Sequence, residues 1–365
     1  MNRGAIAELD RTSLRHNLCL LKQMAPGRGI IAVVKADAYG HGAVEAARIL
    51  EAEKVAMLAV AFLSEARTLR DAGITSEILV LFDRSNPSEF LDLNVVPVIH
   101  DIDTARRFSE ETRKRGIVFN VHLKVDTGMG RLGFPLARHE DIFEICGMEG
   151  IAVTGLMTHF SEADLADKAF ANEQLRVFSE LRQRIMDQTG SSLLCHCANS
   201  AAVFSLPDAL FDAVRPGLSL YGYSTPPDAR LRPVMQLKTS VLAVREVGKG
   251  TPLSYGRTYV TSRPSRIAVL AMGYADGYNR LFSNRAHVLI RGKRVPVVGR
   301  VCMDLTLADV TDIEGVKDGD EVVLLGRQGA ETITADELAS MADTIPYEIL
   351  TSLGPRAQRN WMDGS

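Results

Sequence analysis

Ile30-Ile31-Ala32-Val33-Val34-Lys35 is the stretch that decides the fold, because five consecutive apolar residues lead directly to a lysine. An apolar run without polar alternation is typical of a strand that is buried on both faces, as in a parallel sheet. A lysine at the end of such a strand is costly to desolvate unless it has a partner or a covalent task. Burial also lowers the pKa of the amine and makes it nucleophilic, as a Schiff-base lysine requires. The alternative is a lysine whose ammonium group simply reaches solvent.

Further short apolar runs follow along the first two thirds of the chain, and amphipathic segments separate them. With the first, the runs are Ile30–Lys35, Ala56–Phe62, Ile78–Phe82, Val95–Ile99, Ile117–Val125, Ile151–His159, Leu193–Ala198 and Ala213–Val214. Helices are predicted at Ser64–Arg70, with Ser64 as the N-cap, and at Asp101–Arg115 and Asp164–Thr189, which both end at a glycine. This alternation predicts parallel strands, and about eight units is the count of a (β/α)8 barrel. An open doubly wound sheet is the alternative architecture.

The pattern changes near residue 230, where Pro226-Pro227 and Arg232-Pro233 precede strands that are broken by turns. The predicted strands are Val234–Val247, Ile267–Met272, His287–Ile290, Val295–Val298, Leu305–Val310 and Glu321–Leu325. Glycine-containing turns separate them, and a single helix is predicted at Ala335–Ala342. We therefore expect an α/β protein with an N-terminal, TIM-like (β/α)8 barrel at residues 1–232 and a smaller, mostly-β C-terminal domain at residues 233–365.

Composition narrows the class of protein. The 365 residues are 46% apolar and 24% charged, which is ordinary for a globular enzyme, and the net charge of −3 gives no support for binding to nucleic acid or membranes. The five cysteines are scattered, so a disulfide framework is not expected. On a strand, Cys195 and Cys197 would point away from His196, so we expect no metal site there. The N-terminal residues suggest neither a signal peptide nor a transmembrane span, and we expect a cytoplasmic protein.

Polar residues gather at the predicted carboxyl ends of the barrel strands, where the chemistry of such barrels sits. They are Lys35, Lys124, His159, Asn199-Ser200 and Arg215-Pro216-Gly217. Ser200 and Gly217 follow the last two predicted strands, where phosphate sites often lie. The segment Gly128–Gly133 also matches the dinucleotide pattern G-x-G-x-x-G. The next strand, however, ends in Thr158-His159 rather than in the acidic residue that would hold a ribose, which argues against that alternative.

Several of these stretches resemble the motifs of bacterial alanine racemases, which are pyridoxal-phosphate-dependent enzymes of fold type III. Ala32–Gly42 resembles the cofactor-attachment motif, and Lys124–Gly133 resembles a second motif. Further matches are Cys197–Ser200, Arg215–Gly217, Ser254–Gly256, Gly273–Gly277, Val301–Asp304 and Pro346–Glu348. The resemblance covers nearly the whole chain, and only Asp83–Val98 contains nothing distinctive.

The resemblance implies two groups that move protons. Lys35 would hold pyridoxal 5'-phosphate as an internal aldimine and would serve one face of the substrate, while Tyr255 would serve the opposite face. Arg131 would contact the substrate carboxylate and, with His159, would favour the phenolate, since nearby positive charge lowers the pKa of a tyrosine. Arg215 would donate to the pyridine nitrogen and leave it unprotonated.

The resemblance also implies the rest of the cofactor site. The phosphate would be held by Tyr39, Ser200, Gly217 and Tyr347. Asn199 and His196 would support this shell, His196 by orienting Arg215. Lys124 would be carbamylated by carbon dioxide and would position Arg131.

Met303 and Tyr274 would line the substrate entrance, next to Asp304. Relatives are head-to-tail homodimers in which one subunit's β domain completes the other's site, so each active site is expected to be shared. The implied function is that of an isomerase that interconverts L- and D-alanine, either to supply D-alanine for peptidoglycan or to degrade it. The alternatives are a racemase of broader specificity that accepts serine, a non-catalytic protein that binds the cofactor with a barrel alone, and a decarboxylase of the same two-domain plan.

Overall fold

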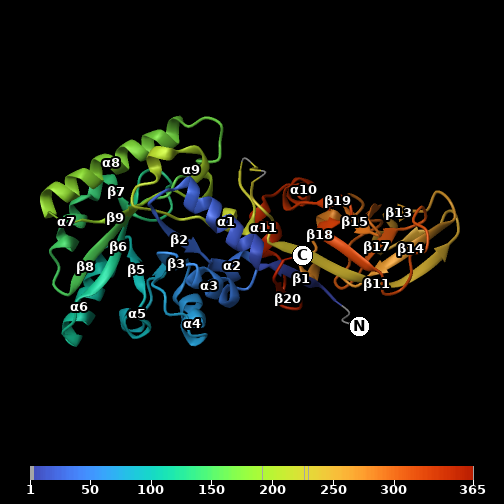
Figure 1. Ribbon diagram of the computed structural model, residues 1–365, viewed down its shortest axis with the longest axis horizontal. Helices are drawn as coiled ribbons and strands as arrows, with labels where there is room; N and C mark the ends of the chain where they lie inside the picture. The colour runs from blue at the N-terminus through green and yellow to red at the C-terminus, as the bar shows by residue number, and fades with distance from the viewer. Residues whose placement is uncertain (1–3, 191, 226, 229, 365) are drawn as a thin grey trace. The chain divides into compact units, whose positions relative to one another are not determined.

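The computed structural model describes residues 4–190, 192–225, 227–228 and 230–364. Within these residues the chain divides into two compact units, whose elements are labelled in Figure 1. The barrel unit comprises Leu14–Ala38 and Ala43–Arg232. The β unit comprises the N-terminal segment up to Ser13, the short piece Tyr39–Gly42, and the chain from Pro233 onward.

Eight parallel strands of the described chain form a nearly closed barrel in the order β10-β2-β3-β4-β5-β6-β8-β9. They are β2 (Gly29–Val33), β3 (Met57–Val60), β4 (Ile78–Val80), β5 (Val96–Ile99), β6 (Phe119–Asp126), β8 (Ile151–Met157), β9 (Leu194–His196) and β10 (Ala213–Val214), with the short β7 (Phe134–Pro135) beside β6. Strands β3, β4 and β5 are buried at every residue, which explains their unbroken apolar sequences. The expected barrel is therefore confirmed, and the open sheet is not adopted.

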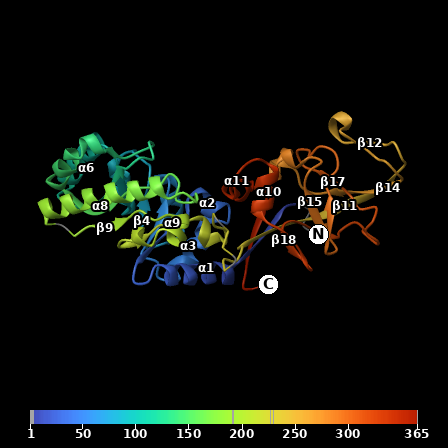
Figure 2. The ribbon, with the colours of Figure 1, turned by 90° about the horizontal axis from the view of Figure 1, so that it is seen from above.

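Helices lie on the outside of the barrel strands, as Figures 1 and 2 show. They are α1 (Arg11–Met24), α3 (Ala43–Ala52), α4 (Leu63–Asp71), α5 (Pro87–Leu93), α6 (Ile102–Arg115), α7 (Glu140–Cys146), α8 (Ala169–Thr189) and α9 (Ser200–Ser205). Asp101 caps α6, because its Oδ1 accepts a hydrogen bond from the Thr104 amide at 2.8 Å. Gly116 and Gly190 end α6 and α8 in the left-handed conformation, with φ of 65° and 64°.

Two predicted helix starts are wrong. Helix α4 begins at Leu63 rather than after Ser64, because the Glu65 carboxylate accepts the Ala61 and Phe62 amides at 2.7 and 3.3 Å and so caps an earlier turn. Helix α8 begins at Ala169 rather than Asp164. The residues before it form a loop that Lys168 holds by donating from Nζ to the carbonyls of Ala163 and Leu165.

The β unit is built on a mostly antiparallel sheet in the order β16-β15-β18-β11-β1-β20, which β14, β17 and β19 extend. Its strands are β1 (Ile6–Asp10), β11 (Met235–Val247), β14 (Ser265–Leu270), β15 (His287–Ile290), β16 (Lys293–Pro296), β17 (Thr306–Asp309), β18 (Glu321–Gln328), β19 (Glu331–Ile333) and β20 (Gln358–Met362), with a separate pair β12 (Pro252–Leu253) and β13 (Tyr259–Val260). Besides the expected helix α10 (Ala335–Met341) it contains α11 (Pro346–Thr351), which the sequence analysis missed.

The N-terminal segment belongs with this sheet and not with the barrel, to which residues 1–232 were expected to belong. Strand β1 pairs antiparallel with β11, where Ala7 faces Leu237, and parallel with β20, where Leu9 faces Trp361. These two ladders satisfy the backbone of β1, and Ala7 and Leu9 are completely buried. A strand of five residues that lies far from its partners in sequence gives no hint of this pairing.

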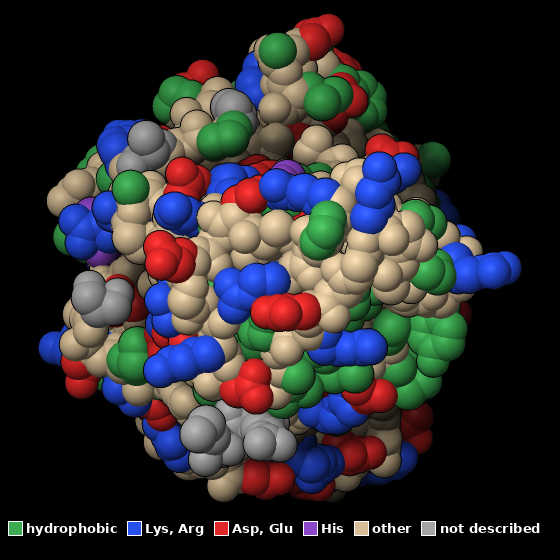
Figure 3. Space-filling model, turned by 90° about the vertical axis from the view of Figure 1, so that its right-hand side faces the viewer, with side chains coloured by type: hydrophobic (Ala, Val, Ile, Leu, Met, Phe, Trp, Pro, Cys, Tyr) green, Lys and Arg blue, Asp and Glu red, His purple; other side chains and the backbone are tan. Residues whose placement is uncertain are grey.

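Charges of both signs are mixed on the face shown in Figure 3, in keeping with the net charge of −3. Many form exposed pairs such as Arg67 with Glu89, which contribute roughly 0–1 kcal/mol each. No helix in the described residues is long and apolar enough to cross a bilayer.

Candidate active site

Lys35 lies just beyond the carboxyl end of β2, and a left-handed backbone turn begins there. The next four residues, Ala36–Tyr39, have φ between 52° and 55° in the segment labelled α2 (Lys35–Tyr39). Left-handed backbone costs non-glycine residues roughly 1–2 kcal/mol each and is found mostly at functional sites. The Ala36 amide donates to Glu65 Oε1 at 2.6 Å, and Asp37 Oδ1 accepts from the Ala43 amide at 2.8 Å. These two carboxylates hold the turn that presents Lys35.

Two further cations join Lys35 at the same rim of the barrel. Lys124 lies near the end of β6 and is 2% exposed, and Arg131 lies in the loop that follows β6. Burial, followed by the charge of Arg131, lowers the pKa of Lys35. The same two causes lower the pKa of Lys124 to about 8. The structure therefore brings Lys35, Lys124 and Arg131 together, as the motifs predicted, and makes both amines easier to deprotonate.

Arg215, directly after β10, is a buried guanidinium held by a line of two histidines. Its Nη1 donates to His196 Nδ1 at 2.8 Å, and His196 Nε2 lies 2.9 Å from His122 Nδ1. An arginine can only donate, so His196 accepts at Nδ1 and donates from Nε2 to His122. Burial, then the charge of Arg215, lowers the pKa of His196 far below its usual range and that of His122 to about 3, so both rings are neutral. Gly155 makes room for this line, since a Cβ there would lie 2.5 Å from the His122 ring.

His159 faces the same guanidinium. Arg215 Nη2 lies 3.4 Å from His159 Nδ1 and donates to the Thr158 carbonyl at 2.6 Å. Burial, followed by the charge of Arg215, lowers the pKa of His159 well below its usual range. The lowered pKa favours the neutral form of His159, which does not favour the expected role of adding positive charge beside a phenolate.

Ser200 and Gly217 meet at the ends of the last two barrel strands. Ser200 Oγ accepts from the Gly217 amide at 2.9 Å and from the Ser219 amide at 3.2 Å. Asn199 Oδ1 accepts from the Ala202 amide at 3.0 Å, so Asn199 caps α9. The two predicted phosphate residues of the barrel are thus adjacent, and Asn199 supports them.

The glycine-rich segment Gly128–Gly133 is already occupied by a carboxylate of its own chain. Asp126 Oδ1 accepts the amides of Gly128 and Gly130 at 3.0 and 3.1 Å. The amides that would cradle a pyrophosphate are therefore used, and the segment leads into β7 rather than a helix. This geometry argues against the dinucleotide alternative.

In the β unit, Tyr255 and Met303 border a pocket of about 480 Å³. Its walls are Ser254, Tyr255, Cys302, Met303, Asp304 and Leu305. Tyr255 is 70% exposed and Met303 is 53% exposed, although both are large apolar side chains. Ser254 Oγ donates to the Arg300 carbonyl at 2.7 Å, which ties the Tyr255 segment to the Met303 loop. Apolar groups exposed around a pocket mark a surface that meets a ligand or another chain.

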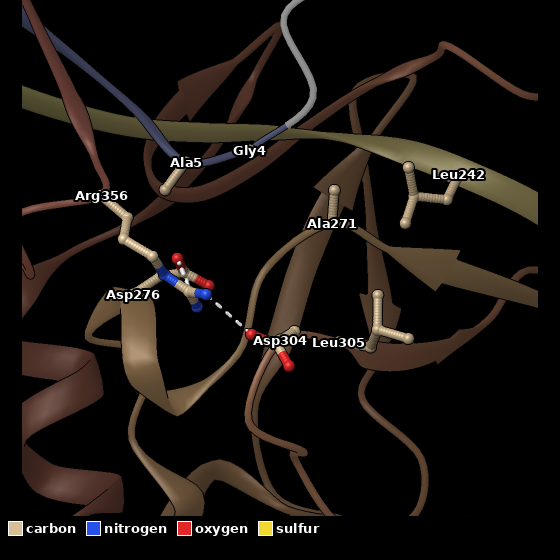
Figure 4. Close-up of a pocket in the computed structure, with 8 residues that line it drawn as sticks. All are labelled: Gly4, Ala5, Leu242, Ala271, Asp276, Asp304, Leu305 and Arg356. Atoms are coloured by element: carbon tan, nitrogen blue, oxygen red, sulfur yellow. Dashed lines mark hydrogen bonds and ion pairs between the residues drawn. The ribbon is translucent and has the colours of Figure 1, made fainter.

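An ion-pair cluster that the sequence analysis missed fixes the Met303 loop. Figure 4 shows Arg356 between two carboxylates, with its Nη2 2.9 Å from Asp276 and its Nη1 2.8 Å from Asp304. The Tyr274 and Ala275 amides donate to the carbonyls of Cys302 and Met303, both at 3.0 Å. Asp304, expected at the entrance, is thus bound to Arg356.

Close approach explains the glycine before Tyr274. A Cβ on Gly273 would lie 2.3 Å from the carbonyl oxygens of both Cys302 and Met303. Only glycine therefore allows the Tyr274 turn and the Met303 loop to stack. The two predicted entrance residues, Tyr274 and Met303, are held together by this contact.

Tyr39 and Tyr347, the other two predicted phosphate residues, pack against each other in the β unit. Their ring centroids are 5.9 Å apart. Burial, followed by Tyr347, raises the pKa of Tyr39, so its hydroxyl stays protonated and can donate. Tyr39 belongs to the short piece of chain, Tyr39–Gly42, that clusters with the C-terminal residues.

Three groups at the barrel rim were not predicted from the sequence. They are Glu65, which holds the Lys35 turn, His122, which extends the line from Arg215, and Phe82, whose ring lies within 6 Å of all three rim cations. His122 could have been suspected, because it precedes Lys124 by two residues on a buried strand and so shares its inward face. Glu65 and Phe82 occupy segments whose composition is ordinary.

Comparison with known proteins gives a family match for each half of the chain. Residues 9–225 match the family model "Alanine racemase, N-terminal domain", and residues 234–361 match "Alanine racemase, C-terminal domain". The alanine racemase of Thermodesulfovibrio yellowstonii is 48% identical over 366 residues, and the alignment covers 99% of this chain and 99% of that protein. That of Syntrophobacter fumaroxidans is 45% identical, with 98% of this chain and 97% of the relative covered.

Solved structures agree. The alanine racemase of Clostridium difficile 630 superposes with a TM-score of 0.93 at 35% identity, covering 100% of this chain and 97% of that one. The enzyme of Bartonella henselae, described with covalently bound pyridoxal phosphate, gives a TM-score of 0.90 at 30% identity, covering 99% and 100%. Because the matches run in order through both units and cover nearly every residue, the chain belongs to the alanine racemase family.

Proposed function

We propose that this protein is an isomerase that interconverts L- and D-alanine with pyridoxal 5'-phosphate, using Lys35 and Tyr255 as its two proton-handling groups. The observation that carries the proposal is the pair formed by Lys35 and Arg131 at the barrel rim. A half-buried amine with a lowered pKa lies beside an arginine that carries no carboxylate partner in the described chain. An amine of this kind is a nucleophile, and the free arginine suits a substrate carboxylate.

The residues present fit the proposed cofactor. Lys35 would hold its aldehyde carbon covalently, and Arg215 would donate to its ring nitrogen. Ser200, Gly217, Tyr39 and Tyr347 would hold its phosphate. The fit rests on the buried guanidinium of Arg215, whose hydrogen bonds go to neutral histidines and backbone carbonyls, so its charge suits a polar ring. When bound, this cofactor delocalises the electron pair that remains after the α-proton leaves.

The protein groups would then handle protons on two sides. Lys35 Nζ, which is readily deprotonated, takes the α-proton from one face or returns it there. Tyr255 exchanges a proton at its hydroxyl oxygen on the other face. Arg131 binds the substrate carboxylate and supplies the positive charge beside the phenol, since His159 is neutral. Met303 and Tyr274 border the way in.

Arg215 would restrain a side reaction, transamination, through its hydrogen bond to the cofactor ring. Burial lowers its pKa to about 10, so the guanidinium is still protonated at pH 7 and can only donate. Because it can only donate, Arg215 would hold the ring nitrogen of the cofactor without protonating it, and the cofactor would then supply a weaker electron sink than it would beside an aspartate. The neutral His196 and His122 keep Arg215 in place without adding charge. A weaker sink favours rapid return of the proton and so disfavours transamination.

We propose that Lys124 carries carbon dioxide as a carbamate. With a pKa of about 8, roughly a tenth of its amine is neutral at pH 7, and the neutral amine is the form that reacts. The resulting anion would lie beside Arg131 and orient it. A mass increase of one carbon dioxide in gentle native spectra, lost in the Lys124→Met variant, would support this assignment.

We further propose that the protein is a homodimer whose active sites are shared. The exposed Tyr255 and Met303 of one subunit would complete the barrel rim of the other. In this division residues 1–232 supply most cofactor contacts and residues 233–365 supply the second base. The cysteines of the described chain are all free, which suits a reducing compartment, and we place the protein in the cytoplasm.

The test is a chiral assay on a panel of amino acids. L-Alanine incubated with the protein and pyridoxal phosphate should approach an equal mixture of enantiomers. Racemised serine as well would indicate a broader racemase, and an amine with carbon dioxide would indicate a decarboxylase. No product from any amino acid by correctly folded, cofactor-loaded protein would overturn the proposed function.

A further inference from the structure

Ser254, the residue before Tyr255, has a backbone conformation that almost only glycine adopts. It lies in the loop between β12 and β13, with φ of 60° and ψ of −176°. A residue with a Cβ is strained in this region and persists there only where the surrounding structure imposes it, most often at functional sites. The presence of serine where glycine would be unstrained points to a role for the serine side chain.

The hydroxyl group of Ser254 ties this loop to the segment that leads to Met303. Its Oγ donates to the Arg300 carbonyl at 2.7 Å, and Cys302 Sγ lies 3.6 Å from the same hydroxyl oxygen. The neighbouring backbone makes room for the side chain, because a Cβ on Gly299 would lie 2.6 Å from the Ser254 Cβ. The structure therefore combines a strained serine with a glycine that accommodates it, and the hydrogen bond to Arg300 holds the two segments together.

The backbone that follows Ser254 forms a compact turn around Tyr255. The Arg257 amide donates to the Ser254 carbonyl at 3.2 Å, and Gly256 and Arg257 also have positive φ, of 71° and 52°. Tyr255 itself is 70% exposed, so side-chain packing within its own unit does little to fix the ring. The direction in which the Tyr255 side chain leaves the backbone is therefore set mainly by this turn, which begins at Ser254.

We propose that Ser254 is a positioning residue: its strained backbone, held by the hydrogen bond from Oγ to the Arg300 carbonyl, presents the Tyr255 hydroxyl to the substrate. The inference rests on the proposed function for the role of Tyr255 as second base, but the hold on the turn rests on geometry alone. A displacement of about 1 Å can cost a reaction about a hundredfold in rate. A glycine at this position would leave the turn free to adopt several conformations, and only a fraction of them would place the phenol correctly.

The first experiment examines the turn in the full chain, without turnover. Ser254→Ala removes the hydroxyl and keeps the Cβ, while Ser254→Gly removes both, relieves the strain and so serves if Ser254→Ala fails to fold. In both variants the Arg257 amide should exchange its hydrogen about three- to tenfold faster, as expected for the loss of one hydrogen bond. Mass spectrometry with single-residue resolution measures this rate. Thr251→Val is the matched control, because it removes a hydroxyl of the same segment that donates to the Gly248 carbonyl at 2.8 Å.

The second experiment distinguishes the two proposed bases in the loaded enzyme, with heavy water as solvent. A misplaced Tyr255 slows inversion, while Lys35 still exchanges the α-proton of the enantiomer that it serves. Ser254→Gly should therefore raise the ratio of deuterium exchange to racemisation about tenfold for one enantiomer of alanine and not for the other. Its kcat for racemisation should fall about tenfold or more, while KM changes by less than about twofold, because Tyr255 does not hold the substrate carboxylate. Thr251→Val should behave like the wild type.

The two measurements together decide the role of Ser254. Equal exchange of the Arg257 amide in the wild type and in both Ser254 variants would overturn the inference, because the hydroxyl would not hold the turn. Faster amide exchange with an unchanged ratio of deuterium exchange to racemisation would also overturn it, since the turn would then not position Tyr255. A wild type that racemises no amino acid would end the proposed function instead, and faster amide exchange in both variants would still support the hold of Ser254 on the turn.

Discussion

At the scale of single residues, the barrel rim concentrates positive charge in a place where charge is costly. Lys124 shows this most directly, since it is almost completely buried and its pKa is about 8 instead of the ordinary 10.5. Below pH 8 the lysine is protonated in both the folded and the unfolded chain, and the folded state bears the whole cost of the buried charge. Between pH 8 and 10.5 the unfolded chain binds more protons, so stability rises with pH.

We therefore predict that, as the pH rises from 8 to 10.5, the cofactor-free wild type gains stability relative to the Lys124→Met variant. The gain attributable to Lys124 is on the order of 3 kcal/mol in the free energy of unfolding. Urea denaturation at a series of pH values, in buffer free of carbon dioxide, measures it. The comparison with Lys124→Met isolates this contribution, because the buried Cys195 and Cys197 thiols, whose pKa values are raised to about 11 and about 12, lower the stability of both proteins in the same window. A stability difference between the two proteins that does not change over this window would contradict the buried, charged lysine.

Lys35 gives the second prediction at this scale. Lys35→Ala should abolish covalent attachment of pyridoxal phosphate and reduce racemase activity by at least about a thousandfold, since nucleophile and base are lost together. Borohydride reduction followed by peptide mapping should label Lys35 in the wild type and nothing in the variant. Lys22→Ala is the control, because Lys22 is exposed and donates to the Glu53 carbonyl at the surface. Labelling at a lysine other than Lys35 would refute the assignment.

At the scale of elements, the line Arg215–His196–His122 depends on a gap in the neighbouring strand. Gly155 of β8 faces the His122 ring of β6, and an added Cβ would lie 2.5 Å from it. Gly155→Ala should therefore push the imidazole aside and destabilise the protein by about 1–3 kcal/mol, as overpacking does. It should also weaken cofactor binding by displacing Arg215.

Denaturant midpoints and cofactor titration test this prediction. Gly147→Ala is a matched control, because its Cβ would meet nothing closer than 3.6 Å. We expect the control to stay within about 1 kcal/mol of the wild type. If Gly155→Ala were as stable as Gly147→Ala, the close approach of the ring would not matter for folding.

The elements also show which parts of the fold can be predicted from the sequence. Strands such as β3, β4 and β5 were found because a strand buried on both faces needs an unbroken apolar run. Helix starts were less accurate, since at α4 the capping carboxylate comes from Glu65 inside the helix. The left-handed turn at Ala36–Tyr39 has no local signal, because its residues are not glycine and tertiary contacts impose it. Strand β1 was missed for a similar reason, as its partners are more than 200 residues away.

The residues of the candidate site also divide into those that could be predicted from the sequence and those that could not. Residues such as Lys35, Lys124 and Arg215 were identified because charge at the end of a buried strand is conspicuous. Phe82 and Arg356 were missed, since an aromatic residue at a strand end and an arginine in a loop are commonplace. Their contribution depends on what surrounds them in space. His159 was singled out, but its charge was not predicted, because its lowered pKa follows from burial and then from the nearby Arg215, both of which depend on the folded structure.

At the scale of the whole molecule, the two proposed bases lie in different units of the chain, and a shared site makes a quantitative prediction. A Lys35→Ala homodimer and a Tyr255→Phe homodimer should each be nearly inactive. After subunit exchange about half of the dimers are hybrids, and each hybrid has one site with both bases intact, so about a quarter of wild-type activity should return. Native mass spectrometry confirms the exchange. Each variant exchanged with itself is the control and should stay inactive. Full exchange without recovered racemisation would show that each site draws both bases from one chain.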